Sequence, residues 1–132
     1  MAMSIFGVGD STLQALGGEE AVRELVDRFY DAMERLPEAR EIREMHPQDL
    51  TLSRDKLATF LTGWMGGPSR YRERFGAISI PSAHRHLSIG EKERDAWLLC
   101  MDTALDEMQV SPELHRYLIT QLRHPAEMCR TR

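Results

Sequence analysis

The stretch EKERDAWLLCMDTALDEM, residues 91–108, carries a clear helical pattern. Its apolar residues recur at steps of three and four, which places them on one face of a helix. These residues are Trp97, Leu98, Met101, Ala104, Leu105 and Met108. The pattern predicts a helix that buries this face and exposes the other.

Residues 19–36 repeat this pattern with Val22, Leu25, Val26, Phe29, Tyr30 and Met33. Pro37 should stop that helix, and a shorter helical piece over residues 37–45 is expected to follow it. His46 precedes Pro47, so the chain should break there, because a residue before proline avoids the helical region.

Two more helices are predicted. The first begins near Ser53, a plausible N-cap, and ends abruptly at the sequence GGP, residues 66–68. The second begins at Ser111, where serine can cap the helix and Pro112 takes its first position. Pro125 is expected to end or kink this last helix.

Strand signals are nearly absent, so the pattern indicates an all-α protein. Only residues 77–80 look β-like, and Pro81 follows them directly. The surrounding segment, residues 69–90, is long for a loop in so small a protein. It is rich in apolar residues, so it should cover something apolar, with at most a short helix around His84.

Composition narrows the class of protein. The chain has 132 residues, which favours one domain, and a net charge of −4 without a basic stripe, which argues against nucleic acid as a partner. It has no apolar run of about 20 residues to span a membrane and no pattern typical of a signal peptide, so a cytoplasmic location is expected. Two cysteines are too few for a disulfide scaffold, and Cys100 should be a small buried apolar residue.

Histidines are the strongest candidates for chemistry. There are five, but no HExxH motif, paired Cys-x-x-Cys, phosphate-binding loop or GxSxG motif accompanies them. His84 and His86 lie two residues apart in the apolar segment. Each is either an ordinary loop histidine or an axial ligand of haem iron, for which neutral imidazole is suited.

Tyr30 and Trp97 allow two interpretations as well. Each lies on the apolar face of a predicted helix, where the usual role is core packing with the polar atom bonded to a neighbour. Alternatively, each donates a hydrogen bond to a ligand on the iron. His46, before a proline, would ordinarily be a surface turn residue.

Several stretches together resemble the group II truncated haemoglobins, the short two-over-two globins. The matching stretches are residues 16–18 (LGG), 28–31 (RFYD), 45–50 (MHPQDL), 60–68 (FLTGWMGGP) and 93–101 (ERDAWLLCM). They occur in the family's order and cover nearly the whole chain after residue 12. The resemblance therefore implies an extension over residues 1–12 and a truncated globin domain over residues 13–132.

The resemblance also implies a haem b cofactor and an arrangement of residues around it. The family's proximal histidine lies thirteen residues before the tryptophan of the ERDAW stretch, which gives His84. His86 is the alternative, because residues 85–87 match the same motif after a slip of two residues. Tyr30, His46 and Trp97 fall at the distal positions around the gas. The implied haem-binding residues are Phe29, Ser53, Leu57, Phe60, Leu61, Tyr71, Phe75, Leu87 and Met101.

The family's function is reversible binding of O₂, CO or NO on the iron, and this is the expected function. An alternative is a haem enzyme that handles peroxide or reactive nitrogen species with an external reductase, in which His46 helps to protonate peroxide. A third possibility is a helical interaction module without cofactor. A monomer or homodimer is expected in each case.

Overall fold

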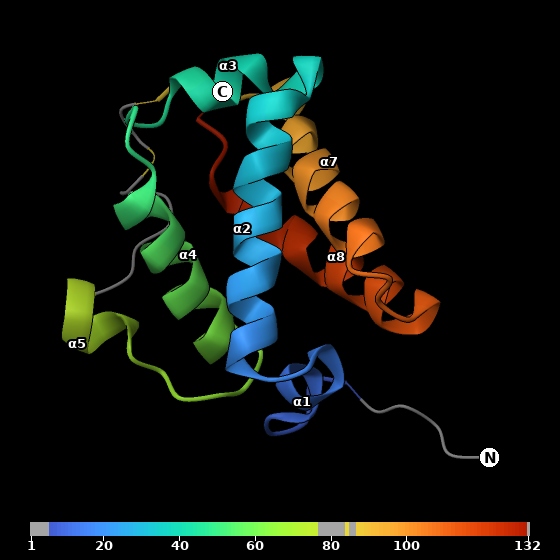
Figure 1. The fold of residues 1–132 in the computed structure, drawn as a ribbon. Helices are drawn as coiled ribbons and strands as arrows, with labels where there is room; N and C mark the ends of the chain where they lie inside the picture. Colours follow the sequence, from blue (N-terminus) through green and yellow to red (C-terminus); the bar gives the residue numbers. More distant parts are fainter. Residues whose placement is uncertain (1–5, 77–83, 85–86, 132) are drawn as a thin grey trace.

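A computed structural model describes residues 6–76, 84 and 87–131 of the chain (Figure 1). Its regular elements are helical, and the described residues include no strand. The elements are α1 (Ser11–Leu16), α2 (Glu19–Arg35), the 3₁₀-helix η1 (Pro37–Ala39), α3 (Arg40–Glu44), α4 (Thr51–Trp64), α5 (Tyr71–Phe75), α7 (Glu91–Glu107) and α8 (Pro112–Met128). The all-α prediction is confirmed.

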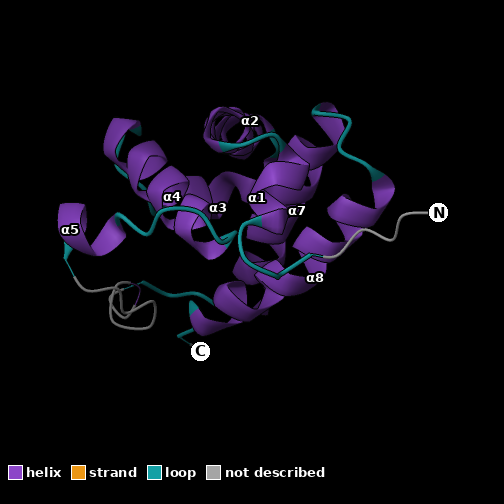
Figure 2. Ribbon diagram, turned by 90° about the horizontal axis from the view of Figure 1, so that it is seen from below, coloured by secondary structure: helices purple, strands orange, loops and turns teal. Residues whose placement is uncertain are grey.

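The long helices form two stacked pairs. Helix α2 packs beside α4, α7 packs beside α8, and α2 lies on α7 (Figures 1 and 2). This is the two-over-two arrangement of the truncated globins. In the described part of the chain, α4 and α7 both pack on α2 but not closely on each other. The two pairs therefore diverge on one side of α2.

Helix α2 is the central helix, and its neighbours cover its apolar face completely. Val22, Leu25, Val26, Phe29 and Met33 are each at most 1% exposed. Burying a side chain of this size stabilises the fold by roughly 1.5–3 kcal/mol relative to leaving it in water. The three- and four-residue spacing in the sequence thus determines which face of α2 meets α7.

Two predicted helix boundaries are wrong. Helix α4 begins at Thr51, so Ser53 is not its N-cap; the Asp49 carboxylate accepts hydrogen bonds from the Thr51 amide (2.9 Å) and hydroxyl (2.7 Å). Of the two outcomes expected at Pro125, an end of the helix is wrong, because α8 continues to Met128, and a kink stays a prediction. The missing proline amide removes only one hydrogen bond from the last turns of that helix.

Other local predictions hold, with one exception. The Ser111 hydroxyl accepts a hydrogen bond from the Leu114 amide (3.3 Å) and caps α8. Residues 37–44 are helical, as η1 followed by α3, one residue short of the predicted end. The expectation of at most a short helix around His84 in residues 69–90 is wrong, because α5 forms there, and its Tyr71 and Phe75 rings, one turn apart, lie 5.1 Å apart.

The turn after α4 requires glycine. Gly66 has a φ of +95°, and a Cβ there would lie 1.8 Å from the Gly9 carbonyl oxygen. The same turn accepts a hydrogen bond, since the Leu13 amide donates to the Met65 oxygen (3.3 Å). The GGP sequence therefore closes the end of α4 against residues 9–13.

Three further sequence predictions concern single features. Cys100 is completely buried, as expected, and both cysteines are free thiols. Within the described ranges, no helix is long and apolar enough to cross a membrane. The β-like residues 77–80 and the alternative ligand His86 lie outside the described residues.

Candidate functional site

Aromatic rings form a continuous row through the interior. Trp97 of α7 meets Phe29 of α2 edge-on, with ring centres 5.1 Å apart, and Phe29 meets Tyr30 at 4.9 Å. Tyr30 then meets the His46 ring at 5.7 Å, just after α3. The three residues predicted for the distal side are thus brought together, with Phe29 as the link between them.

Tyr30 presents a protonated hydroxyl in this row. Its side chain is 5% exposed, and burial raises the pKa of its hydroxyl to about 12, although the charge of Arg54 opposes that shift. Among the described residues, the hydroxyl reaches only the Ser53 carbonyl, at 3.5 Å, which is long for a hydrogen bond. Tyr30 therefore has a donor that its surroundings use weakly.

Trp97 offers a second donor. Its indole N–H can only donate, and no acceptor for it occurs among the residues that the structure describes. The ring is half-buried at the edge of the core. Trp97 therefore combines an apolar body with an unused N–H next to Phe29.

His46 is half-buried and oriented by one backbone group. Its Nδ1 lies 2.7 Å from the Ile42 carbonyl oxygen, which can only accept, so Nδ1 carries the proton. Burial lowers the pKa of His46, the hydrogen bond to Ile42 opposes this, and the positive charges of Arg43 and His84 lower it further. The imidazole is therefore neutral at physiological pH.

The lowered pKa of His46 makes stability depend on pH. The unfolded chain binds this proton at a pKa near 6.5 but the folded protein only at lower pH, so stability should fall as pH drops below about 6.5. Urea unfolding at pH 7.5 and 5.5 should show His46→Gln losing part of this decrease, at most about 1.4 kcal/mol per pH unit. His124→Gln, on exposed α8 surface, should keep the wild-type dependence; equal slopes in both variants would contradict the prediction.

His84 lies between α5 and α7 in the chain and contacts the end of the chain after α8. It is half-buried, and its charge influences His46. Its carbonyl accepts a hydrogen bond from the Leu87 amide (2.9 Å), which forms a turn leading to buried Ile89. Its Nε2 lies 3.7 Å from the Cys129 sulfur.

Several large apolar side chains on α4, α5 and α7 and after His84 remain only partly buried. They are Leu57 and Phe60 of α4, Trp97 of α7, Tyr71 and Phe75 of α5, and Leu87 after His84. Ser53 is half-buried too, whereas Phe29, Leu61 and Met101 are completely buried in the core. Incompletely covered apolar side chains and a half-buried histidine are the kinds of groups that hold a flat apolar cofactor with a metal ion, which is the chemistry of haem.

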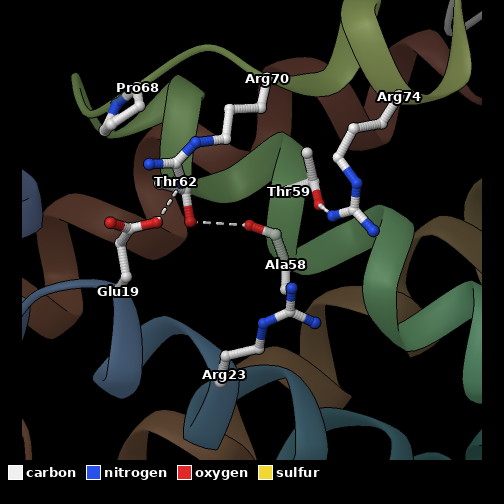
Figure 3. A pocket seen from close by; sticks show the side chains of 8 residues that line it. All are labelled: Glu19, Arg23, Ala58, Thr59, Thr62, Pro68, Arg70 and Arg74. Carbon is white, nitrogen blue, oxygen red and sulfur yellow. Dashed lines mark hydrogen bonds and ion pairs between the residues drawn. The ribbon is translucent and has the colours of Figure 1, made fainter.

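A separate cavity between α2, α4 and α5 has a different character. Arg23, Arg70 and Arg74 point into it, together with Thr59 and Thr62 (Figure 3). Such a charged lining does not suit an apolar cofactor.

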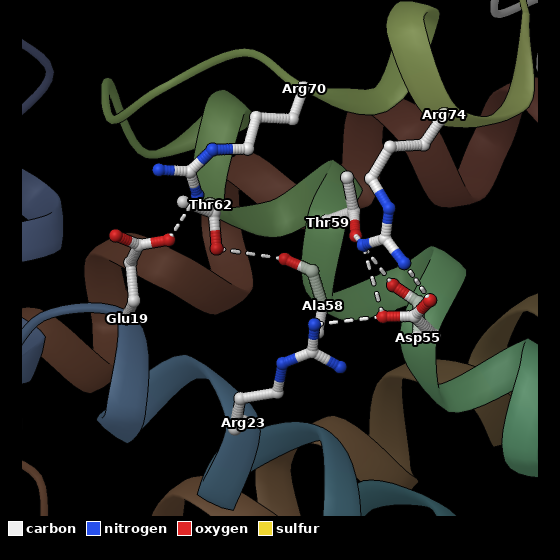
Figure 4. Close-up of polar contacts among 8 residues, drawn as sticks. All are labelled: Glu19, Arg23, Asp55, Ala58, Thr59, Thr62, Arg70 and Arg74. Atoms are coloured by element: carbon white, nitrogen blue, oxygen red, sulfur yellow. Dashed lines mark hydrogen bonds and ion pairs between the residues drawn. The ribbon is translucent and has the colours of Figure 1, made fainter.

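Ion pairs account for the charges in this cavity. Asp55 pairs with both Arg23 and Arg74, and Glu19 pairs with Arg70 (Figure 4). Hydrogen bonds from the two arginines hold the pKa of Asp55 below its usual value. The network fastens α5 to α2 and α4 and so positions Tyr71 and Phe75.

Three residues beside the site were not predicted from the sequence. Arg54 lies 5.6 Å from the centre of the Tyr30 ring, and Cys129 and Thr131 contact the segment that contains His84. The sequence could have indicated only Arg54, because it directly follows Ser53, which was predicted to lie at the site. The other two lie more than 40 residues from their partners, and no local spacing indicates such a contact.

Known proteins resemble this chain in sequence. Residues 11–129 match the family described as bacterial-like globin. The chain is 35% identical over 105 residues to the group 2 truncated haemoglobin YjbI of Bacillus subtilis, covering 80% of this chain and 77% of that protein.

Solved structures are similar as well. The group II two-on-two haemoglobin of Agrobacterium tumefaciens superposes with a TM-score of 0.85 at 38% identity, covering 97% of this chain and 98% of that one. A truncated oxygen-avid haemoglobin from Bacillus subtilis gives a TM-score of 0.82 at 32% identity, covering 90% and 98%.

Proposed function

The chain belongs to the group II truncated haemoglobins, within the bacterial-like globin family, and from this premise we propose that it binds haem b through His84 and reversibly takes up O₂. When bound, haem supplies a ferrous iron with an open position for a diatomic gas such as O₂, CO or NO. His84 holds the cofactor by its imidazole, and Leu57, Phe60 and Phe75 exclude water from it.

Two unused donors carry the proposal. The Tyr30 hydroxyl has one long hydrogen bond, and the Trp97 N–H has none among the described residues. The Tyr30 hydroxyl is buried and the Trp97 ring is half-buried, so a ligand beside them could accept hydrogen bonds that the protein leaves long or unmade. O₂ accepts hydrogen bonds when it draws electron density from iron, whereas CO accepts them poorly, so these donors favour O₂.

The neutral state of the donors supports slow gas release. Tyr30 keeps its proton across the physiological range because its pKa is about 12. The Bacillus subtilis structure cited above is described as oxygen-avid, and we propose similarly tight O₂ binding here. Tight binding suits sensing or redox use better than delivery, which requires ready release.

The absorption spectrum of the purified protein tests the proposal. We expect a Soret band in the isolated or hemin-loaded protein, and a shift of that band when CO is added after dithionite. Absence of a Soret band after hemin addition would overturn the proposal and favour a helical interaction module.

A further inference from the structure

We propose that Thr131, in the segment that follows α8, positions the proximal histidine by fixing the backbone after His84. The inference rests on the proposed function, in which His84 holds the haem. It assigns to Thr131 a role in the orientation of the iron ligand without any contact to the cofactor.

Thr131 is bonded to this segment at three points. Its hydroxyl donates to the Leu87 carbonyl (2.6 Å) and accepts from the Ile89 amide (2.8 Å), and its own amide donates to the Ile89 carbonyl (2.7 Å). One hydroxyl has a single proton to donate, so these bonds satisfy its donor and use its acceptor. Thr131 therefore spans two peptide groups that follow the histidine (Figure 2, where the chain after α8 lies on the same side as the loop before α7).

Leu87 connects Thr131 to His84, because it forms hydrogen bonds with both residues. The Leu87 amide donates to the His84 carbonyl (2.9 Å), while the Leu87 carbonyl accepts from Thr131. Next to α7, the Gly90 amide donates a hydrogen bond (2.6 Å) to the carboxylate of Glu93, a residue that is only 3% exposed. Leu87 and Ile89 are thus tied to Thr131 after α8, and Gly90 is tied to α7 by Glu93.

Cys129 contacts the His84 ring itself, but this contact cannot orient the ring once the ring binds iron. Its sulfur lies 3.7 Å from Nε2 of His84 and 3.3 Å from the Pro125 carbonyl oxygen. A ring nitrogen bonded to iron has no free electron pair or proton for the thiol. The Thr131 bonds involve only backbone groups of the histidine segment, so they persist when the imidazole binds iron.

The fixed backbone should restrict how the imidazole turns against the haem. Outer groups that orient a metal ligand change the strength of its bond to the metal. Thr131→Val keeps the shape of the side chain but removes both hydroxyl bonds, so the segment should open more often. We expect a shifted or broadened iron–histidine stretching band in the ferrous unliganded protein.

The experiment combines resonance Raman spectra with hydrogen exchange on the haem-loaded full chain. Thr131→Val should speed exchange of the Ile89 amide by about two- to tenfold, the range for loss of one net hydrogen bond, and should alter the Raman band. Thr131→Ser, which keeps the hydroxyl, should restore both. Thr103→Val is the matched control, because it removes a hydroxyl bond to Leu99 within α7 (2.8 Å).

The other possible outcomes contradict either the role of Thr131 or the assignment of His84. If Thr131→Val changes neither quantity, or speeds Ile89 exchange with an unchanged band, Thr131 does not position the ligand. If Thr103→Val alters the band equally, the effect is general loosening and the inference is wrong. Failure of the His84 assignment is recognised separately, because the iron–histidine band would then survive in His84→Gly.

Discussion

Replacing His84 with glycine is expected to speed haem loss by more than about a hundredfold, because outer-shell changes alone cost 10- to 100-fold in metal affinity and this change removes the ligand itself. The apolar contacts of Leu57, Phe60 and Phe75 would remain but cannot replace a bond to iron. Transfer of haem to an excess of a haem-scavenging globin, followed at the Soret band, measures the rate.

The folded state should tolerate this change. His84 is half-buried, and its contact with the Cys129 sulfur is weak at 3.7 Å. Far-ultraviolet circular dichroism should therefore be unchanged, and added free imidazole should restore the spectrum of His84→Gly by binding iron in the vacated space. Loss of helical signal would instead indicate a structural role.

Two other histidines provide the controls. His124→Ala, on the exposed surface of α8, should retain haem at the wild-type rate. His86→Ala tests the alternative ligand, and it too should retain haem. Rapid haem loss in His86→Ala together with normal retention in His84→Gly would transfer the proximal role to His86.

The long helices were predictable because periodicity and packing agree. In α2 and α7 the apolar spacing determines a single buried face, and at α8 Ser111 supplies both the cap and the boundary. The start of α4 was not predictable in this way, because Ser53 is a good cap residue in sequence, whereas the helix starts at Thr51 after Leu50, which has no capping side chain. Helix α5 has one turn, too few residues for a periodic signal.

The candidate site required more than local sequence. Tyr30, His46 and Trp97 are far apart in the chain, and no spacing rule brings their rings together; the family resemblance proposed the set, and the structure shows the row through Phe29. Contacts between the end of α8 and the His84 segment were outside both kinds of reasoning. Such contacts depend on where α8 ends relative to α7, which is a property of tertiary packing.

A positioned donor needs a rigid frame, and ion pairs supply one around Tyr30. Arg54 of α4 lies near the Tyr30 ring and bonds Asp27 (3.0 Å) and Asp31 (3.1 Å) of α2. Each surface pair contributes little alone, but together they fasten the start of α4 to α2 beside the hydroxyl. The Tyr30 donor is thereby fixed before any ligand arrives.

Replacing Tyr30 with phenylalanine is expected to speed O₂ release by about five- to 150-fold, because a desolvated hydrogen bond contributes about 1–3 kcal/mol and about 1.4 kcal/mol is tenfold in rate. Stopped-flow displacement of O₂ by CO measures the rate. Protein stability should change little, because the bond that the described part of the chain loses is the long 3.5 Å contact with Ser53. Tyr117→Phe, on α8 against Phe6, is the control and should leave the rate unchanged.

The pH profile separates hydrogen bonding from a change in charge. Because the pKa of Tyr30 is about 12, the hydroxyl stays protonated from pH 6 to 9, and the ratio of variant to wild-type rates should be constant over that range. A ratio that falls toward one at alkaline pH would mean that the hydroxyl ionises in the pocket. An unchanged rate at every pH would leave Trp97 as the donor that retains O₂, since its N–H does not titrate and has no other acceptor among the described residues.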